Sequence, residues 1–387
     1  MELYGFHFST FELIVVALLI IAFGHQLYFY LRYINGVLRY KSRINKGKIS
    51  FRNEQPPVSV VICAKDESEN LRNFLPSVLQ QDYPNYEVIV INDGSSDDTE
   101  DLLKDFKKVY KNLRSTFVPA EANNFSTKKL GLTLGIKAAE FDWLLFTDAD
   151  CKPHDKQWIS RMARNFHPET EFVLGFGTYF TDKGLLNKLI NYDTLFIALQ
   201  YLGMAASKKP YMGVGRNMAY RKQTFFDQKG FASTLHLQSG DDDLMVNKAA
   251  NSRNTSIEIS PESITYSEPN KTFKGWFYQK ERHLSVSSYY TTISKFRLGI
   301  EPITRGLFYL SLILSICFGG LITWITASVL FLTRYIIQLV VVNRSAIHFG
   351  TPKFYTTLLL FDVYLPLVSL YIYTSNSFSK SKTIRWK

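Results

Sequence analysis

The sequence predicts a mostly parallel α/β domain flanked by transmembrane α-helices. Two observations support this fold class. Strand-like apolar runs alternate with helix-like segments between about residues 50 and 295, which is the rhythm of a parallel sheet with helical crossovers. Long apolar segments lie on both sides of that region. With 387 residues, 46% of them hydrophobic, the chain can build a sizeable core and is not disordered.

The flanking segments have the length of membrane helices. The run "FELIVVALLIIAFGHQLYFY", Phe11 to Tyr30, contains the roughly 20 apolar residues that one crossing needs. A longer C-terminal region is interrupted by "FGG" at residues 318–320, which predicts a turn between two helices, and a further apolar run covers 355–373. We therefore expect an N-terminal anchor over residues 1–32 and two or three helices over residues 303–375.

Basic residues indicate the orientation in the membrane. Seven basic residues and no acidic ones lie between Arg32 and Arg52, which predicts that the middle domain is cytosolic and the N-terminus faces outward. The net charge of +11 suits a domain beside anionic membrane lipids, and no nucleic-acid recognition signature accompanies it. Three C-terminal crossings would leave the basic tail, residues 376–387, outside. Either one segment is re-entrant or interfacial, or the charge rule fails here.

Three strand-like runs of the middle region end in acidic residues. "PPVSVVICAKDE" ends at Asp66 and Glu67, "YEVIVINDGSSDDT" contains Asp93, and "DWLLFTDAD" ends at Asp148 and Asp150. In parallel α/β sheets the ligand lies outside the carboxyl ends of the strands, so these acids mark the expected site.

The D-x-D pair suits a hard divalent cation, because Mg²⁺ and Mn²⁺ prefer oxygen ligands and share phosphate oxygens with the protein. A solvated turn is the simpler interpretation of an isolated D-x-D. Its alignment with two other acid-ended strands favours the metal. The three cysteines, Cys63, Cys151 and Cys317, show no metal or disulfide spacing and are interpreted as reduced structural thiols.

A series of motifs resembles one enzyme family. It comprises "VSVVICAKDESENL", "YEVIVINDGSSDDT", "TKKLGLTLGIKAA", "FTDADCKP", "GVGRNMAYRK", "SGDDDL" and "QKERH", in this order over residues 57–290. The chain resembles membrane-bound family 2 glycosyltransferases, whose catalytic domain has the GT-A fold. The resemblance implies a GT-A domain over residues 50–265. The segment over residues 266–300 mixes Lys and Arg with Trp, Phe and Tyr, which predicts an interfacial amphipathic segment or, as the alternative, a partly buried amphipathic helix.

The resemblance also implies roles for single residues. Asp66 and Asp93 match positions that hold the base and ribose of a nucleotide, with Glu67 adjacent. Lys128 matches a position near the donor diphosphate. Asp148 and Asp150 match the metal-binding pair. From the residues alone, Asp93 is either part of a helix N-terminus or a contact to the base or ribose of a nucleotide, and Lys128 is either a surface lysine or a cation that neutralises a diphosphate.

The "GDDD" stretch matches the region that supplies the catalytic base. Alignment on Leu244 makes Asp241 the base, whereas alignment on the Gly-Asp-Asp start makes it Asp242, which we favour; Asp243 would contact the substrate. An acidic helix cap is the structural alternative, but three adjacent carboxylates repel one another more than capping requires.

"QKERH" resembles the Q-x-x-R-W motif that binds the diphosphate and the acceptor end. Gln279 and Arg282 match, whereas His283 replaces the tryptophan and offers a smaller stacking surface.

The expected reaction is inverting, metal-dependent transfer of a sugar from a nucleotide-sugar donor, with UDP as the expected nucleotide. The acceptor would be a lipid-linked or cell-surface glycan at a bacterial inner membrane, with the catalytic domain in the cytoplasm. The predicted membrane helices leave little chain to form a translocation channel. This favours the transfer of a limited number of sugars over the synthesis of a long polymer. A sugar nucleotidyltransferase and a non-catalytic subunit of a glycan assembly complex remain alternatives, and the need for a partner subunit stays open.

Overall fold

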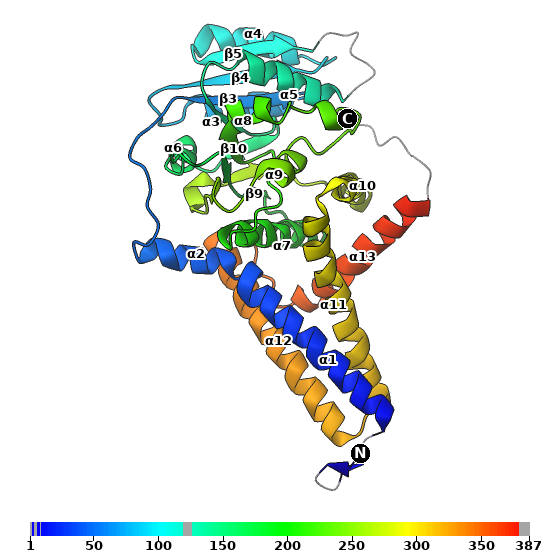
Figure 1. Cartoon of the computed structure of the whole chain (residues 1–387). Helices are drawn as coiled ribbons and strands as arrows, with labels where there is room; N and C mark the ends of the chain where they lie inside the picture. Colours follow the sequence, from blue (N-terminus) through cyan, green and yellow to red (C-terminus); the bar gives the residue numbers. More distant parts are fainter. Residues whose placement is uncertain (1, 4–5, 8, 119–125, 379–387) are drawn as a thin grey trace.

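A computed structural model describes residues 2–3, 6–7, 9–118 and 126–378 of the chain. An α/β domain occupies the middle of the sequence, and a stalk of long helices projects from it (Figure 1). The N-terminal residues lie at the far end of this stalk, where β1 (Glu2–Leu3) pairs with β2 (Phe6–His7).

The domain is built on a seven-stranded mixed sheet. Its central strands are parallel, and β10 runs antiparallel to both of its neighbours. In spatial order the strands are β11 (Thr255–Ile257), β8 (Phe172–Leu174), β10 (Met218–Arg221), β6 (Trp143–Phe146), β3 (Val58–Ala64), β4 (Tyr86–Asn92) and β5 (Leu113–Phe117). The mostly parallel α/β prediction is therefore confirmed, and the three acid-ended runs are the parallel strands β3, β4 and β6.

Helices cover both faces of the sheet. Alternate residues of β3 explain this: Val60 and Ile62 pack with α3, α4 and α6, whereas Val61 and Cys63 pack with α5. The covering helices are α3 (Ser68–Leu79), α4 (Thr99–Val109), α5 (Thr127–Ala138) and α6 (Trp158–Ala163), with the shorter α8 (Lys222–Asp227) and α9 (Asp243–Ala249) nearby. A second, three-stranded sheet joins β7 (Cys151–Pro153), β12 (Thr265–Ser267) and β9 (Gly177–Tyr179).

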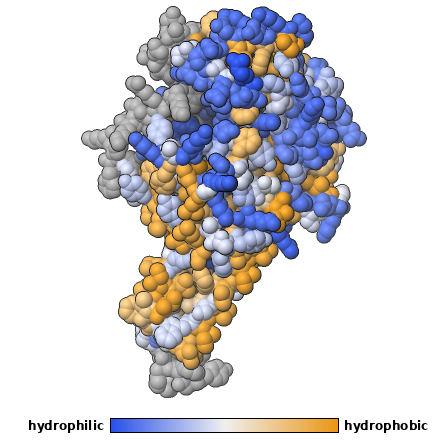
Figure 2. Space-filling model, turned by 180° about the vertical axis from the view of Figure 1, so that it is seen from behind, coloured by the Kyte–Doolittle hydropathy of each residue, from blue (hydrophilic) through white to orange (hydrophobic). Residues whose placement is uncertain are grey.

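Among the residues that the structure describes, four helices are long and apolar enough to cross a membrane. They are α1 (Thr10–Phe29), which continues into a π-helical turn (Tyr30–Ile34), α11 (Thr292–Phe318), α12 (Leu321–His348) and α13 (Leu358–Phe378). The break between α11 and α12 lies at Gly319 and Gly320, as "FGG" predicts. Apolar surface covers the stalk and extends onto the lower edge of the domain (Figure 2).

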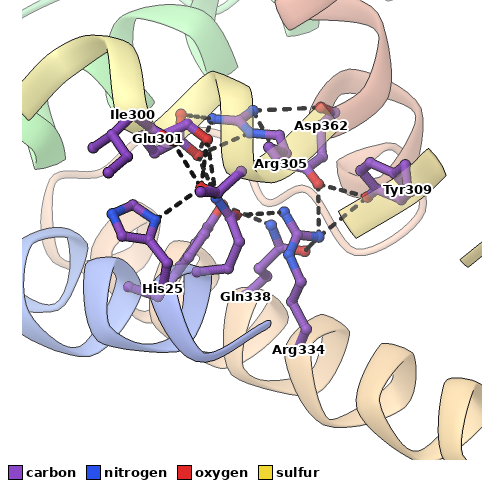
Figure 3. Close-up of polar contacts among 11 residues, drawn as sticks. His25, Ile300, Glu301, Arg305, Tyr309, Arg334, Gln338 and Asp362 are labelled. Carbon is purple, nitrogen blue, oxygen red and sulfur yellow. Dashed lines mark hydrogen bonds and ion pairs between the residues drawn. The ribbon is translucent and has the colours of Figure 1, made fainter. Parts of the chain in front are cut away.

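A buried ionic network joins these four helices (Figure 3). Arg305 of α11 donates to both carboxylate oxygens of Glu301 at 2.6 Å and to Asp362 of α13 at 3.2 Å. Arg334 of α12 donates to Asp362 at 2.9 Å and to Gln26 of α1 at 3.0 Å. Two arginines thus face two carboxylates. Charged side chains that are buried away from water need a partner of opposite charge, because leaving one of them unpaired costs about 3–5 kcal/mol.

Three helices lie where the stalk meets the domain: α2 (Gly36–Asn45), α7 (Leu185–Ala206) and α10 (Phe273–Val286). The segment from Ser267 to Leu298 is not one amphipathic helix. It contains the end of β12, then α10, a 3₁₀ turn over Ser287–Tyr289, and the first turns of α11.

The backbones of α2 and α7 touch at two glycines. A Cβ on Gly203 would lie 1.8 Å from the carbonyl oxygen of Tyr33, and a Cβ on Gly36 would lie 2.5 Å from Cα of Gly203. Neither obstacle is a flexible side chain, so the close approach of the N-terminal helices to the domain requires glycine at both positions.

This contact yields a stability prediction. Gly203→Ala places a methyl group against the backbone of Tyr33 and should destabilise the protein by about 1–3 kcal/mol or more, the cost of overpacking. Gly306→Ala is the matched control, because it also lies in a helix but its Cβ would meet nothing within 4 Å. Thermal unfolding in one detergent should show a lower Tm for Gly203→Ala and an unchanged or higher Tm for Gly306→Ala. Equal Tm values would show that the two backbones separate without cost.

Candidate functional site

The predicted site residues gather at the carboxyl edge of the parallel strands. Because β3, β4 and β6 are parallel neighbours, the loops that follow them emerge at one edge of the sheet. These loops carry Asp66, Asp93 and Asp148, respectively.

Asp66 and Asp93 tie the first two loops together. Asp66 has a left-handed backbone conformation with φ of +52°, and its carboxylate accepts a hydrogen bond from the Ser96 amide at 2.6 Å. Asp93 is buried and accepts a hydrogen bond from Thr127 Oγ1, at the start of α5, at 2.7 Å. Burial raises the pKa of Asp93, and the bond from Thr127 partly offsets this effect. Asp66 is thus held against the loop that follows β4, and Asp93 is held against the N-terminus of α5.

Glu67 has a more local role in the structure. It stands at the start of α3, where its carboxylate accepts a hydrogen bond from Asn70 at 2.6 Å and its amide donates to Thr99 at 3.3 Å.

Lys128 lies between two of the predicted acidic groups. Its Nζ is 3.1 Å from Oδ1 of Asp148 and 3.6 Å from Oδ2 of Asp241. Burial alone would lower the pKa of Lys128, but Asp148 and Asp241 outweigh burial and raise it. Burial would likewise raise the pKa of Asp148, but Lys128 outweighs it and lowers that pKa. The lysine is thus a fixed positive charge at the edge of the sheet.

Asp148 and Asp150 fit a divalent cation. One ligand atom from each of Asp148, Asp150 and Cys151 lies within 4.8 Å of the others. Burial and the charge of Asp148 raise the pKa of Asp150, although Arg216 and Lys128 act to lower it. Two carboxylates that converge in this way are the donor set that Mg²⁺ and Mn²⁺ prefer.

Cys151 contributes a thiol to this group. Its Sγ is 2.9 Å from Oγ of Ser267 and 3.5 Å from Oδ1 of Asp150. Burial and then Asp150 raise the pKa of the Cys151 thiol well above its usual range. A protonated thiol that already has hydrogen-bond partners is consistent with the interpretation of Cys151 as a structural residue.

Arg216 is a cation of the site that the sequence reasoning missed. Its guanidinium stacks on the ring of Tyr179, with its central carbon 4.4 Å from the ring centroid. Burial opposes its charge, but Tyr179, Cys151, Asp150 and Asp148 together raise its pKa. The sequence did contain a signal for this residue, because Arg216 lies in the "GVGRNMAYRK" motif. Its position beside the D-x-D, however, depends on the pairing of β10 with β6.

The three adjacent aspartates of "GDDD" have different environments. Asp241 is buried and faces Lys128. Asp242 caps α9, and its two oxygens accept hydrogen bonds from the Gly215 amide at 2.6 Å and the Asp243 amide at 2.8 Å. Burial and the charge of Asp241 raise the pKa of Asp242. Asp241 and Asp242 both line a small pocket together with Lys128 and Asp148.

Asp243 has another partner. Tyr290, which precedes α11, donates a hydrogen bond to its Oδ2 at 2.6 Å. Burial and the neighbouring Asp242 raise the pKa of Asp243 to about 8, although the bond from Tyr290 lowers it. Asp243 thus connects the acidic loop to the beginning of a stalk helix.

The "QKERH" residues lie on α10 and reach the site through other side chains. Gln279 donates to the hydroxyl of Tyr179 at 3.0 Å, and Tyr179 in turn supports Arg216. Arg282 donates to Ser239, just before the acidic loop, at 3.3 Å, and its other terminal nitrogen is 3.3 Å from Nε2 of His283.

Lys129 holds the same loop from the other side. Its Nζ donates to the carbonyl oxygens of Thr234 and Ser239 at 2.7 and 2.8 Å, and burial lowers its pKa to about 8. Neighbouring lysines of α5 thus have separate tasks: Lys128 faces the carboxylates, and Lys129 fixes the loop. Sequence spacing alone does not distinguish them.

Comparisons with known proteins agree with this geometry. Residues 59–228 match the family model described as Glycosyl transferase family 2. The poly-beta-1,6-N-acetyl-D-glucosamine synthase of Staphylococcus epidermidis strain RP62A is 41% identical over 93 residues, which are 24% of this chain and 21% of that protein. The probable glycosyltransferase YdaM of Bacillus subtilis strain 168 is 24% identical over 378 residues, 86% of each chain.

The more identical relatives are matched over only 21% to 34% of their own lengths. Among solved structures, the mannosyltransferase PcManGT from Pyrobaculum calidifontis, in complex with GDP-Man and Mn²⁺, superposes with a TM-score of 0.62 and 16% identity. This superposition covers 96% of this chain and 99% of that one, and it shows a shared fold. Residues 59–228 therefore form a domain similar to glycosyltransferase family 2, and the chain shares its fold with a solved mannosyltransferase.

Proposed function

We propose that this glycosyltransferase transfers a sugar, with inversion, from a nucleoside diphosphate sugar to a hydroxyl group of a membrane-associated acceptor, with the aid of a divalent cation. The observation that carries the proposal is the position of Lys128. It lies between the D-x-D carboxylate that would face the donor phosphates and the acidic loop that would face the acceptor.

The nucleoside would be held by the first two strand-end loops. Asp66 offers a carboxylate beside the loop after β4, Asp93 offers one beside the start of α5, and Glu67 follows Asp66 in the chain. These groups accept hydrogen bonds, and both a base and a ribose offer donors. We take UDP as the nucleotide.

The diphosphate would lie against the cations of the site. Lys128, Arg216 and Arg282 stabilise the negative charge that develops as the diphosphate leaves the sugar. Asp148 and Asp150 would hold Mn²⁺ or Mg²⁺, which supplies additional charge stabilisation for the phosphate oxygens when bound. Electrostatic preorganisation of this kind requires positive groups that do not reorient during the reaction, and stacking on Tyr179 fixes Arg216.

The acidic loop would supply the general base. Asp242 is fixed by two backbone amides, and its raised pKa brings it closer to the proton affinity that a base needs near neutral pH. We assign Asp242 as the base, which takes the proton from the attacking hydroxyl. Asp241 would hold Lys128 in place. A single base opposite the leaving group gives one displacement and therefore inversion.

The acceptor would reach the site along the membrane. The α10 helix carries Gln279 and Arg282 next to the site, and it lies where the stalk joins the domain (Figure 1). A lipid-linked or cell-surface glycan acceptor fits this position, and His283 would be an acceptor contact in place of an indole. The charge distribution supports a cytoplasmic domain in a bacterial inner membrane.

The donor and the metal can be tested together. Detergent-purified protein is incubated with UDP and GDP sugars and Mn²⁺, and release of nucleoside diphosphate is measured. We expect release from one donor, with loss in EDTA and a loss of at least about a hundredfold in Asp148→Asn, because a charge-stabilising group is removed. Asp97→Asn is a control carboxylate outside the acidic cluster, where its bonds are to Ser68 and Thr99. Full activity in EDTA would contradict the metal proposal.

The assignment of Asp242 as the base predicts different kinetic effects for Asp242→Asn and Asp241→Asn. Asp242→Asn should lower kcat by about 10² to 10⁴, the usual contribution of a general base, with donor binding preserved. Asp241→Asn releases Lys128 and should weaken donor binding more than it changes kcat. Isothermal titration with nucleoside diphosphate and steady-state kinetics measure the two effects. The reverse pattern would make Asp241 the base.

The same assignment predicts a pH dependence. Asp242 acts only when it is deprotonated, so kcat/KM should fall as the pH falls through its raised pKa. Removal of the like charge in Asp241→Asn should lower that pKa and move the acidic limb of the profile to lower pH. A pH–rate profile of both proteins measures this shift, and an unmoved limb would exclude Asp242 as the titrating base.

A further inference from the structure

The last apolar helix, α13, differs from the other three in where its two ends lie. It has 21 residues and passes the length and composition criteria for a membrane crossing. However, α1, α11 and α12 extend from the domain to the far end of the stalk, whereas α13 runs across their direction and back toward α10 (Figure 1).

The first turns of α13 are fixed at the junction of stalk and domain. Asp362 is fully buried and binds Arg305 of α11 and Arg334 of α12 (Figure 3). The adjacent Phe361 packs against Tyr192 of α7, with ring centroids 5.4 Å apart.

The later turns of α13 contact the domain again. Tyr371 packs against Phe277 of α10, with ring centroids 6.1 Å apart. Lys280 of α10 forms a salt bridge of 2.8 Å with Asp193 of α7, which fixes α10 to the same part of the domain. Contacts ten residues apart along α13 are therefore both on the domain side, about 15 Å from each other along the helix.

The depth of α13 follows from the lengths of its neighbours. Arg305 lies thirteen residues before Phe318, and Arg334 lies thirteen residues after Leu321, so both are about 20 Å from the turn at the far end. A hydrocarbon core is about 30 Å thick. With the turn at the far boundary of this core, Asp362 lies about 10 Å below the domain-side boundary, the depth at which amphipathic interfacial helices are buried.

One face of α13 is apolar and exposed. Leu360, Leu367 and Leu370 are 55%, 59% and 60% exposed, and Val363 lies between them in a helical spacing of three and four residues. Asp362 is the one charged residue in the sequence of α13, and it is paired inside the protein. Ile313 of α11 and Ile325 and Ile336 of α12 are similarly exposed, so these helices also present apolar side chains outward.

We propose that α13 does not cross the membrane but lies in the plane of the bilayer, within the domain-side leaflet, with one face on α7 and α10 and the other on lipid acyl chains. The chain then crosses three times, through α1, α11 and α12. The basic stretch over residues 32–52 and the last turn of α13 then lie on the same side of the membrane, which accords with the charge rule for the basic residues that follow α13 in the sequence. Four crossings would place them on opposite sides. The proposal is independent of the transferase activity.

The side of the C-terminus tests the number of crossings. In a Cys317→Ser background, where the remaining Cys63 and Cys151 are buried, single cysteines are introduced by Lys387→Cys, Lys46→Cys and Glu2→Cys in the full-length chain. Intact and permeabilised cells are treated with a membrane-impermeant maleimide. We expect Lys387→Cys to label only after permeabilisation, like Lys46→Cys beside the domain and unlike Glu2→Cys. Labelling in intact cells would overturn the proposal.

Depth measurements distinguish an in-plane helix from a re-entrant one that also returns the C-terminus to the domain side. A fluorescent label is attached to Leu360→Cys, Leu367→Cys or Leu370→Cys in liposomes that contain lipids brominated at defined depths. An in-plane helix gives equal depths at all three positions. The controls, Leu332→Cys and Val340→Cys, are exposed positions in the domain-side half of α12 and should differ in depth by about 12 Å. A comparable gradient along α13 would overturn the proposal even with a C-terminus on the domain side.

Discussion

The site depends on the ion pairs that the ammonium group of Lys128 forms with Asp148 and Asp241. Asp148 and Asp241 come from segments almost a hundred residues apart, and without a cation between them their carboxylates would repel each other at the edge of the sheet. Because Lys128 is held at the first turn of α5, the two acids keep their separation without a ligand. Donor and acceptor chemistry would therefore meet at one lysine, and the arrangement needs no movement of the sheet.

The membrane part of the molecule follows the same electrostatic logic. Arg305 and Arg334 balance Glu301 and Asp362 where water is scarce, and this balance fixes the position at which α13 leaves the stalk. The glycine contact between α2 and α7 then brings the backbone of the first membrane helix against the domain. Charge pairing and close backbone packing together set how the catalytic domain is presented to the bilayer.

Strand-end acids were the part of the site that the sequence could predict, because hydrophobic runs locate β3, β4 and β6 and a parallel sheet places their ends together. The fold class followed from the same runs. Arg216 could not be placed in this way, since its position depends on the antiparallel pairing of β10, and no local pattern encodes that pairing. The tasks of Lys128 and Lys129 also required tertiary structure. A hydropathy analysis identifies α13 as a fourth membrane crossing, because it measures the length and composition of a helix but not on which side of the membrane each end lies.

A route of contacts connects α13 to the D-x-D side of the site. It begins at α13, where Tyr371 packs on Phe277 of α10, and continues two residues further along α10 at Gln279. Gln279 supports Tyr179, and Tyr179 supports Arg216 beside the D-x-D. Apart from the short step along α10 itself, each contact is a packed ring pair, a hydrogen bond or a cation–ring contact, so a displacement of α10 would reach Arg216 beside the D-x-D. Packing of α13 beneath α10 would thus do more than anchor the chain: it fixes the height of the site above the lipid from which an acceptor would come.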